Sequence, residues 1–338
     1  LNGPRGPFEV RHGATVVATG GKEYRGPEYG YGAGSSQGDS RILTQQEFGQ
    51  RLADADRLPD SVVMIQCVGP AERYCSRICC TTALKNALVL KRQKPDAQVT
   101  VIYRDIRTYG FKERIYEEAR RAGVMFVRYD FDRKPDVQIA DAELRVAVVD
   151  PVLGRELTLK PTLVVLSMPI VPSDGAKELA TRLKVPVDLD GFFMEAHVKL
   201  RPVDFATDGF FLAGMANYPK LLGESIAQAQ AAAARAATIL SRDTLEVGGI
   251  VAQVDEAECV GCLTCVRICP YDVPQIRADL SGVGGTKGAA YIEPAQCHGC
   301  GICVGECPAR AIQLLHYQDA QMEAKVAALM EPVPARVP

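Results

Sequence analysis

Between residues 61 and 170 the chain alternates short, continuous apolar runs with segments whose apolar residues recur at helical spacing. Continuous apolar runs of this length are typical of strands that are buried on both faces of a sheet. Strands are predicted at 61–66, 98–105, 124–129 and 162–168, a hairpin at 144–159 around Asp150-Pro151, and helices at 81–91 and around Tyr116, Ala119 and Ala122. This alternation indicates an α/β domain with a largely parallel sheet.

Shorter apolar segments flank this domain. A β-rich run ends in Ala18-Thr19-Gly20 and predicts a strand that enters a tight turn near a nucleotide, although an ordinary strand and turn also explains it. After the domain, an apolar strand ends at Gly214 and an alanine-rich helix follows over 223–240. That helix is either a core helix or one whose N-terminus faces an electron-rich group.

Ahead of the domain, residues 30–38 indicate a glycine-rich linker, and Thr44–Glu47 resembles a capping box that opens a helix to about residue 55.

The first loop of the α/β domain lacks the residues that bind a dinucleotide. A loop that binds a pyrophosphate at this place needs glycines, because only without side chains can its backbone N–H groups approach the pyrophosphate closely. The loop has one glycine, Gly69, and instead carries four cysteines: Cys67, Cys75, Cys79 and Cys80. A metal site is therefore predicted where the phosphate site would be. Asp105 stands where an acid usually holds a ribose, and without a phosphate loop we favour a turn or a partner contact for it.

The strongest motif lies near the end of the chain. Two runs share the spacing C-x₂-C-x₂-C-x₃-C-P of two-cluster bacterial ferredoxins, in which the fourth cysteine of each run ligates the other cluster. One cubane is therefore predicted on Cys259, Cys262, Cys265 and Cys307, and a second on Cys297, Cys300, Cys303 and Cys269. Structural zinc sites have a longer spacer between their cysteine pairs. His298 lies between two of these ligands and is not needed, because the cysteine set is complete.

All 12 cysteines thus fall into three groups of four. A disulfide framework suits small secreted chains, whereas this chain has 338 residues and 47% hydrophobic residues, and we expect no signal peptide. We therefore expect a reducing, cytoplasmic compartment. For the group at 67–80 the residues alone leave buried thiols and structural zinc open beside a cluster.

Charge and composition narrow the function further. The 39 Lys and Arg residues against 41 Asp and Glu residues give a net charge of −2, which indicates neither nucleic acid nor a membrane surface as partner. No apolar run approaches the roughly 20 residues needed to cross a bilayer. Four scattered histidines and the absence of a Ser/His/Asp or paired-carboxylate pattern argue against acid–base catalysis.

Together these motifs resemble the A-type subunit family of heterodisulfide reductase and its bacterial relatives. The resemblance rests on Ile65–Gly69, Cys75–Cys80, Tyr103–Gly110, Glu117–Val124 and the double ferredoxin motif, and it extends from about residue 14 to 330. It implies a thioredoxin-reductase-like flavoprotein portion with an inserted cluster domain, followed by an α+β ferredoxin domain. The expected divisions are 1–58 (end of the first part of the FAD domain, and linker), 59–172 (inserted domain), 173–245 (return to the FAD domain), 246–320 (ferredoxin domain) and 321–338 (C-terminal helix or tail).

The resemblance also implies roles for single residues. Cys67, Cys75, Cys79 and Cys80 would ligate the inserted cluster, and Lys85 would lie near the reactive edge of the flavin, where its charge stabilises a reduced flavin; a solvated helix lysine is the alternative. Thr19, Gly20, Gly214, Ser225 and Ile226 match stretches that touch FAD. Met215 stands where related flavoproteins often have an acid, so that contact must differ. The glycine-rich FAD fingerprint is absent, so we expect FAD to be shared with an upstream FAD-domain half.

The implied function is that of an oxidoreductase subunit that passes electrons between FAD and three 4Fe-4S clusters by flavin-based electron bifurcation, in an anaerobic complex. A passive iron–sulfur relay without bifurcation is the alternative. The implied partners are the other subunits of a heterodisulfide-reductase-like complex, ferredoxin and an electron-input subunit. A pyridine-nucleotide disulfide reductase is disfavoured, because the chain has no redox C-x-x-C beside the flavin segments and no glycine-rich loop after Gln66.

Overall fold

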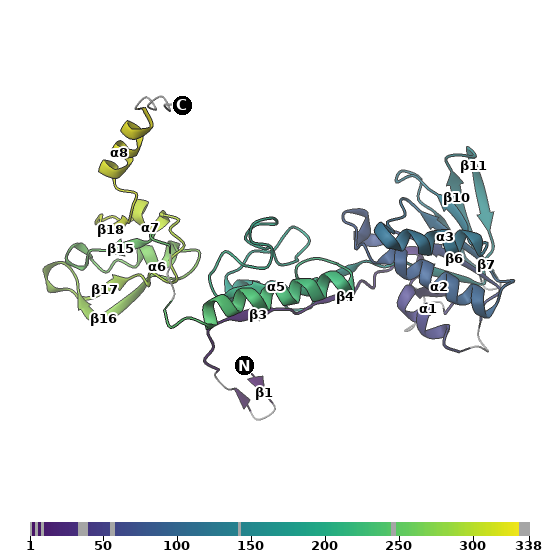
Figure 1. The fold of residues 1–338 in the computed structure, drawn as a ribbon, viewed down its shortest axis with the longest axis horizontal. Coiled ribbons are helices and arrows are strands. Elements are labelled where there is room, and N and C mark those ends of the chain that lie inside the picture. Colours follow the sequence, from purple (N-terminus) through teal and green to yellow (C-terminus); the bar gives the residue numbers. More distant parts are fainter. Residues whose placement is uncertain are drawn as a thin grey trace, which may run out of the picture.

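The computed structural model of the protein describes residues 2–3, 6–7, 10–32, 40–54, 58–140, 143–244 and 248–330. Figure 1 shows three bodies that follow one another along the long axis of the molecule. An α/β body lies at one end, a middle body built around helix α5 (Leu222–Leu240) follows, and a small body with the ferredoxin motifs lies at the other end. Among the described helices, none combines the length and the apolar character needed to cross a membrane.

The α/β body contains a parallel sheet, as the sequence predicted, and the sheet has five strands, of which β5 was not predicted. Its strand order is β5-β12-β6-β7-β8, and every neighbouring pair is parallel. The strands are β5 (Ile42–Thr44), β6 (Ser61–Ile65), β7 (Gln98–Tyr103), β8 (Met125–Arg128) and β12 (Leu163–Leu166). Helices α1 (Gln45–Arg51), α2 (Cys79–Gln93) and α3 (Glu113–Arg121) pack on one face of this sheet.

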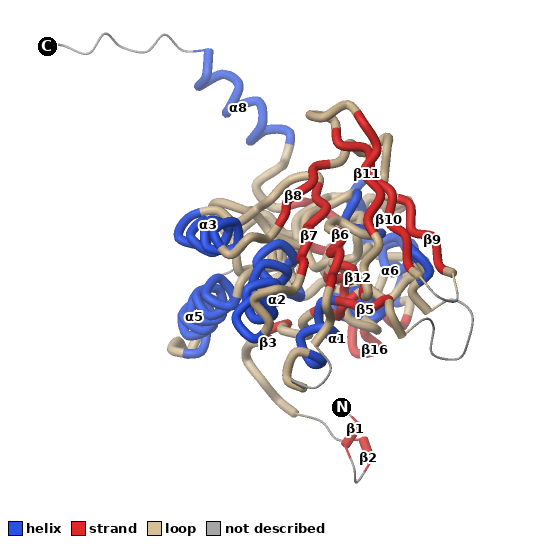
Figure 2. The backbone as a smooth tube through the Cα atoms, turned by 90° about the vertical axis from the view of Figure 1, so that its right-hand side faces the viewer, coloured by secondary structure: helices blue, strands red, loops and turns tan. Residues whose placement is uncertain are grey.

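The other face of the sheet is covered by an antiparallel sheet of β9 (Asp136–Ile139), β10 (Leu144–Asp150) and β11 (Arg155–Leu159), which includes the predicted hairpin (Figure 2). Because side chains alternate along a strand, Met64 packs in the core on the helix side and Ile65 in the core on the hairpin side. Burial on both faces explains why the sequence shows continuous apolar runs instead of an apolar–polar alternation.

The α/β body begins earlier in the chain than the expected division at residue 59. Strand β5 pairs with β12 at the edge of the sheet, and Phe48 of α1 is fully buried in the helix-side core. The predicted capping box of α1 is present: the Thr44 hydroxyl accepts a hydrogen bond from the Glu47 N–H at 3.3 Å, and the Glu47 carboxylate accepts one from the Thr44 N–H at 2.8 Å. The expected helix end at residue 55, and most of the expected linker at 30–38, lie outside the described residues.

The middle body joins two distant stretches of chain. Strand β3 (Thr15–Val17) pairs in parallel with β14 (Phe210–Leu212), and α5 packs on them through Ala232 and Ala236. Strand β4 (Gly21–Glu23), which leads towards the α/β body, pairs antiparallel with β13 (Ile170–Pro172), which leads away from it. The chain therefore enters and leaves the α/β body side by side. Helix α4 (Ala176–Leu183) completes the middle body.

The third body is built from two antiparallel pairs of strands and two short helices. Strand β15 (Ala252–Val254) pairs with β18 (Ile312–Leu314), and β16 (Gln275–Ser281) with β17 (Lys287–Tyr291). Helices α6 (Thr264–Ile268) and α7 (Ile302–Gly305) each carry the third cysteine of a ferredoxin motif. The remaining elements are β1 (Asn2–Gly3), β2 (Gly6–Pro7), the projecting helix α8 (Asp319–Met330) and short 3₁₀ turns at Glu28–Gly30, Gly69–Glu72, Gly110–Lys112, Gly214–Ala216, Glu256–Glu258 and Val283–Gly285.

Candidate metal centres and flavin site

The four cysteines of the α/β body line one cavity of about 230 Å³. Cys67 follows the end of β6 and adopts a positive φ of 60°, and Cys79 and Cys80 open helix α2. Cys75 lies between them, after the 3₁₀ turn at Gly69–Glu72. The end of a parallel strand and the start of the next helix therefore hold the thiols at the edge of the sheet where α/β domains usually bind their ligands.

Burial determines the electrostatics of these thiols. Burial raises the pKa of Cys67, and that of Cys79 still more, and it raises the pKa of Cys80 to about 11. The cavity wall also contains four arginines: Arg73, Arg77, Arg104 and Arg107. Neutral thiols release their protons when they bind a metal, and the surrounding guanidinium groups favour the anionic complex that results.

The cavity wall also contains polar atoms that suit an anionic group. Within the described residues, Gln66 Nε2 and Oε1 and Arg104 Nη1 are buried without a hydrogen-bond partner. The Arg77 N–H donates to the Cys75 sulfur at 3.3 Å. Four thiols together with unpartnered N–H donors are the donor set that an anionic iron–sulfur cluster requires. The residues present therefore fit such a group.

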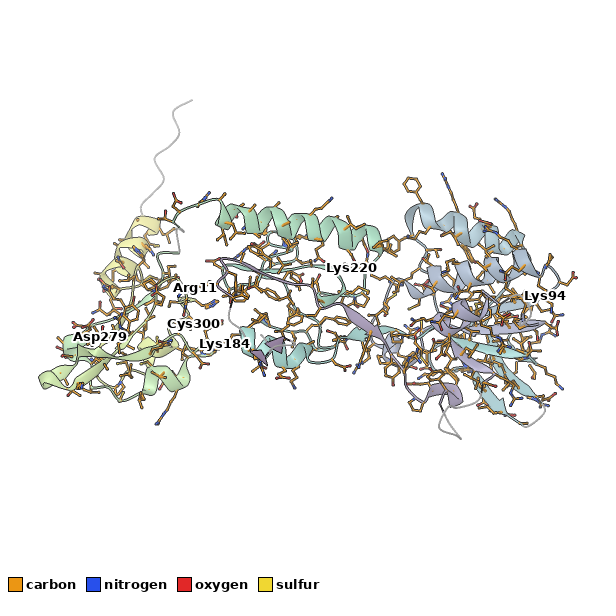
Figure 3. All side chains as sticks on the ribbon, turned by 90° about the horizontal axis from the view of Figure 1, so that it is seen from below. Arg11, Lys94, Lys184, Lys220, Asp279 and Cys300 are labelled. Atoms are coloured by element: carbon orange, nitrogen blue, oxygen red, sulfur yellow. The ribbon has the colours of Figure 1, made fainter. Side chains whose placement is uncertain are left out.

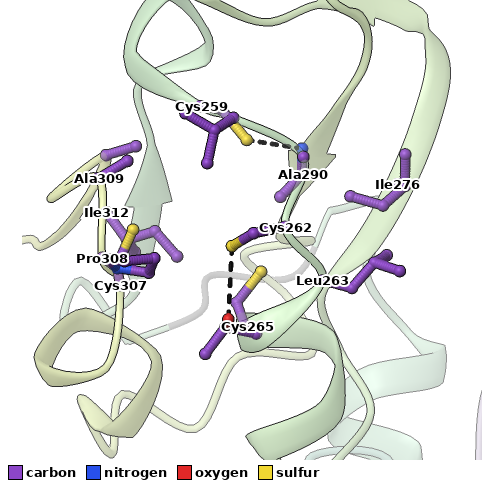
Figure 4. Close-up of a pocket in the computed structure, with 14 residues that line it drawn as sticks. Cys259, Cys262, Leu263, Cys265, Ile276, Ala290, Cys307, Pro308, Ala309 and Ile312 are labelled. Atoms are coloured by element: carbon purple, nitrogen blue, oxygen red, sulfur yellow. Dashed lines mark hydrogen bonds between the residues drawn. The ribbon is translucent and has the colours of Figure 1, made fainter.

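In the third body, Cys259, Cys262, Cys265 and Cys307 line one small cavity (Figure 4). The structure thus brings together three cysteines of the first ferredoxin motif and the last cysteine of the second. Its other lining residues are mainly apolar or small and include Leu263, Ile276 and Ile312. Burial, and after it the nearby thiols of Cys259, Cys262 and Cys307, raise the pKa of Cys265.

The remaining cysteines of the third body also come together. Burial raises the pKa of Cys303 to about 11, and the thiols of Cys297, Cys269 and Cys300, and after them that of Cys265, contribute to the rise. The Cys297 sulfur accepts hydrogen bonds from the N–H groups of Ala252 at 3.3 Å and Gly299 at 3.4 Å. In the described part of the chain, no group of three or more His, Cys, Asp or Glu side chains is arranged to hold a single metal ion.

His298, between two of these cysteines, makes a contact that the sequence did not predict. Its ring stacks on Tyr271 with 3.8 Å between the ring centroids, and its Nε2 lies 3.4 Å from the Thr207 hydroxyl of the middle body. Beside this contact, Lys184 of the middle body forms an ion pair with Asp272. Figure 3 shows Lys184 and Cys300 at this junction. The second group of ferredoxin cysteines therefore faces the middle body.

The residues expected to contact FAD lie at one end of the β3–β14 pair. Thr19 and Gly20 follow β3, Gly214 and Met215 follow β14, and the Gly214 N–H donates to Gln228 of α5 at 2.8 Å. Gly20 and Gly214 both have positive φ and open space where a Cβ would lie, so a ligand can approach their backbone closely. Ser225 and Ile226 lie in the first turns of α5.

Lys85 lies on the exposed side of α2 and lines a separate, open cavity of about 530 Å³. Gly21, directly after Gly20, lines the same cavity. So does Cys79, which also lines the first cysteine cavity. Cys79 is therefore shared between the cysteine cavity and the Lys85 cavity.

Two interactions around these sites were missed from the sequence. Arg77, in the cysteine loop, forms an ion pair with Glu224 in the first turn of α5, so that it connects the α/β body to the middle body. Lys220 is buried and donates hydrogen bonds of 2.9 Å to Gly214 O, Asn217 Oδ1 and Gln228 Oε1, and burial lowers its pKa to about 8 (Figure 3). Neither has a sequence signal, because the partners come together only on folding. Asp105 is exposed, lies in the irregular segment after β7 and pairs with Arg107 at 3.0 Å.

Comparison with known proteins places these sites in context. Residues 258–312 match a family model described as a 4Fe-4S dicluster domain. The chain is 36% identical over 293 residues to the A-type subunit of the H(2):CoB-CoM heterodisulfide,ferredoxin reductase of Methanothermobacter marburgensis, a match that covers 80% of this chain and 43% of the relative. It is 36% identical over 356 residues to the first of the A-type iron-sulfur subunits of the CoB--CoM heterodisulfide reductase of Methanopyrus kandleri, a match that covers 96% of this chain and 51% of the relative. The chain thus spans about half the length of these curated relatives.

Among solved structures, the thioredoxin reductase of Lactococcus lactis is similar with a TM-score of 0.41 and 16% identity, over 68% of this chain and 67% of that one. The thioredoxin reductase of T. acidophilum is similar with a TM-score of 0.39 and 15% identity, over 67% of this chain and 64% of that one.

Proposed function

The chain belongs to the family of A-type heterodisulfide reductase subunits, about half of whose length it spans, and from this we propose that it is an electron-transferring oxidoreductase subunit. In this proposal it binds three 4Fe-4S clusters and contributes to an FAD site. The observation that carries the proposal is the arrangement of the 12 cysteines: one group of four lines a cavity at the edge of the parallel sheet, and the two ferredoxin motifs bring their cysteines together in the third body.

When bound, the clusters carry single electrons and the flavin carries an electron pair. The residues of this chain then serve to hold and space these groups. Cys67, Cys75, Cys79 and Cys80 hold one cluster at the edge of the parallel sheet. The ferredoxin cysteines hold the other two, one on Cys259, Cys262, Cys265 and Cys307, the other on Cys269, Cys297, Cys300 and Cys303.

For the flavin, Thr19, Gly20, Gly214, Met215, Ser225 and Ile226 would provide backbone contacts, and Lys85 a positive charge. The shared position of Cys79 supports a direct approach between the Lys85 cavity and the first cluster site. The contact of His298 with Thr207 and the ion pair of Lys184 with Asp272 support a second approach, between the middle body and the ferredoxin cysteines. Two approaches to one flavin site are what the distribution of electrons along two routes requires, so we propose bifurcation as the finer function.

An anaerobic redox titration of the flavin in the full assembly with its partner subunits tests this proposal. Bifurcation requires crossed one-electron potentials, in which the second electron leaves the flavin at a lower potential than the first. Two ordinary, uncrossed potentials would identify a passive relay. The proposed partners are an electron-input subunit, ferredoxin and the other members of a heterodisulfide-reductase-like complex, and co-purification from the native cells would identify them.

A further inference from the structure

Gln66 is the most deeply buried polar side chain in the wall of the first cysteine cavity. It is fully inaccessible to solvent, and within the described residues neither Nε2 nor Oε1 has a hydrogen-bond partner. Its backbone is fixed on both sides: the N–H donates to Ile102 O at 2.9 Å, and the carbonyl accepts from the Tyr129 hydroxyl at 3.1 Å. A buried amide with two unpartnered atoms is costly, so the site requires a group that supplies a partner.

Arg104 lies in the same cavity wall, directly after β7, and its Nη1 is also buried without a partner among the described residues. Its guanidinium lies over the ring of Phe131, 5.3 Å from the centroid. Its positive charge therefore lies in the wall of the cavity that the four cysteines line.

The other arginines of the cavity have acidic partners. Arg73 pairs with Asp190 at 3.3 Å, Arg77 with Glu224, and Arg107 with Asp105 at 3.0 Å. The described residues give Arg104 no such partner. The charge of a paired guanidinium is largely offset by its acidic partner, whereas the charge of an unpaired, partly buried guanidinium is not.

We propose that Gln66 and Arg104 are positioning residues that raise the reduction potential of the cluster held by Cys67, Cys75, Cys79 and Cys80. This rests on the proposed use of that cavity as a cluster site. Gln66 Nε2 and Arg104 Nη1 donate towards the cluster sulfurs. Reduction adds one electron to the cluster, supplied by dithionite in the experiment below, and no protein bond forms or breaks. Because the added charge is negative, both donors stabilise the reduced form more than the oxidised form.

An EPR-monitored titration of the iron-loaded chain with dithionite tests the proposal. Gln66→Met keeps the approximate length of the side chain and removes its donor, and Arg104→Met removes the charge and leaves a shorter apolar side chain. Each substitution should lower one of the three cluster potentials and leave the other two unchanged. The expected shift is about 59 mV, which corresponds to about a tenfold change in the equilibrium constant for a one-electron reduction of the cluster. Arg104→Lys keeps the charge and should retain most of the parent potential. The double variant Arg107→Gln/Asp105→Asn removes both charges of an ion pair in the same cavity and should leave all three potentials unchanged.

The outcomes separate this inference from the proposed function. Gln66→Met and Arg104→Met proteins with full iron content and unchanged potentials would overturn the tuning role and leave the cluster site standing. A parent protein that shows two clusters instead of three would overturn the site itself. If Gln66→Met fails to assemble its cluster, the potential of that cluster is compared between Arg104→Met and Arg104→Lys. Equal potentials in these two variants would contradict the proposal.

Discussion

The ligand exchange between the two ferredoxin motifs makes a sharp prediction for Cys307→Ser. Cys307 belongs to the second motif, yet it lines the cavity of Cys259, Cys262 and Cys265. No other cysteine in the described part of the chain lines that cavity, so no second thiol is at hand to replace it. The variant should therefore damage the first-motif cluster and spare the cluster on Cys297, Cys300, Cys303 and Cys269.

The magnitude follows from the ligand count. A cubane that loses one of four ligands loses between about one iron and all four, so the iron content should fall by about 1–4 atoms out of about 12. Cys262→Ser and Cys300→Ser are the matched controls, because both side chains are exposed and each belongs to one predicted set only.

The EPR spectrum of reduced Cys307→Ser should resemble that of Cys262→Ser, since both remove a ligand from the same cluster. The reciprocal variant Cys269→Ser should resemble Cys300→Ser. If Cys307→Ser instead matched Cys300→Ser, each motif would keep its own fourth ligand, and the assignment of the two sites would be wrong.

Three further predictions concern the α/β body and its contact with the middle body. Lys85→Ala should lower the flavin potential in the full assembly with all clusters retained, whereas Lys85→Arg should not, and an unchanged flavin titration in Lys85→Ala would place this lysine on a merely solvated face. Glu224→Gln should weaken the contact with Arg77 by at most about 1 kcal/mol, because both side chains are about one-third exposed. The iron content should stay unchanged, and a loss of iron would show that the ion pair determines the conformation of the cysteine loop. Leu84→Ala should lower the free energy of unfolding of the α/β body by about 2–5 kcal/mol in urea, because this side chain is fully buried between α2 and the sheet, while an effect below about 1 kcal/mol would contradict that packing.

The parts of the fold that the sequence predicts are those with a local signal. Strand β12 is apolar at every position because it is buried on both faces, and the hydroxyl of Thr44 and the carboxylate of Glu47 form a cap within four residues. The cysteine spacing is likewise local, and the ferredoxin rule for the fourth ligand places Cys307 with the first motif from the spacing alone.

The parts that the sequence misses depend on contacts between distant residues. Strand β5 has three residues, which are too few to show a periodic pattern of apolar positions. Its place in the sheet comes from pairing with β12, which lies far along the chain. The pair of Arg77 and Glu224 has no sequence pattern for the same reason. Gln66 reads as the end of an apolar strand, and its significance comes from the unpartnered amide that the folded cavity encloses.

The central claim is that three sites, and not two, hold clusters in this chain. Anaerobic measurement of iron and acid-labile sulfide on the purified protein tests it directly, with the fourfold variant in which Cys67, Cys75, Cys79 and Cys80 are all changed to serine as the control. We predict about 12 irons and about 12 sulfides per chain, at four of each per cubane, and about eight of each in the variant. A value of about eight in both proteins would contradict the account, because it would leave the ferredoxin clusters alone and remove the cluster from the α/β body.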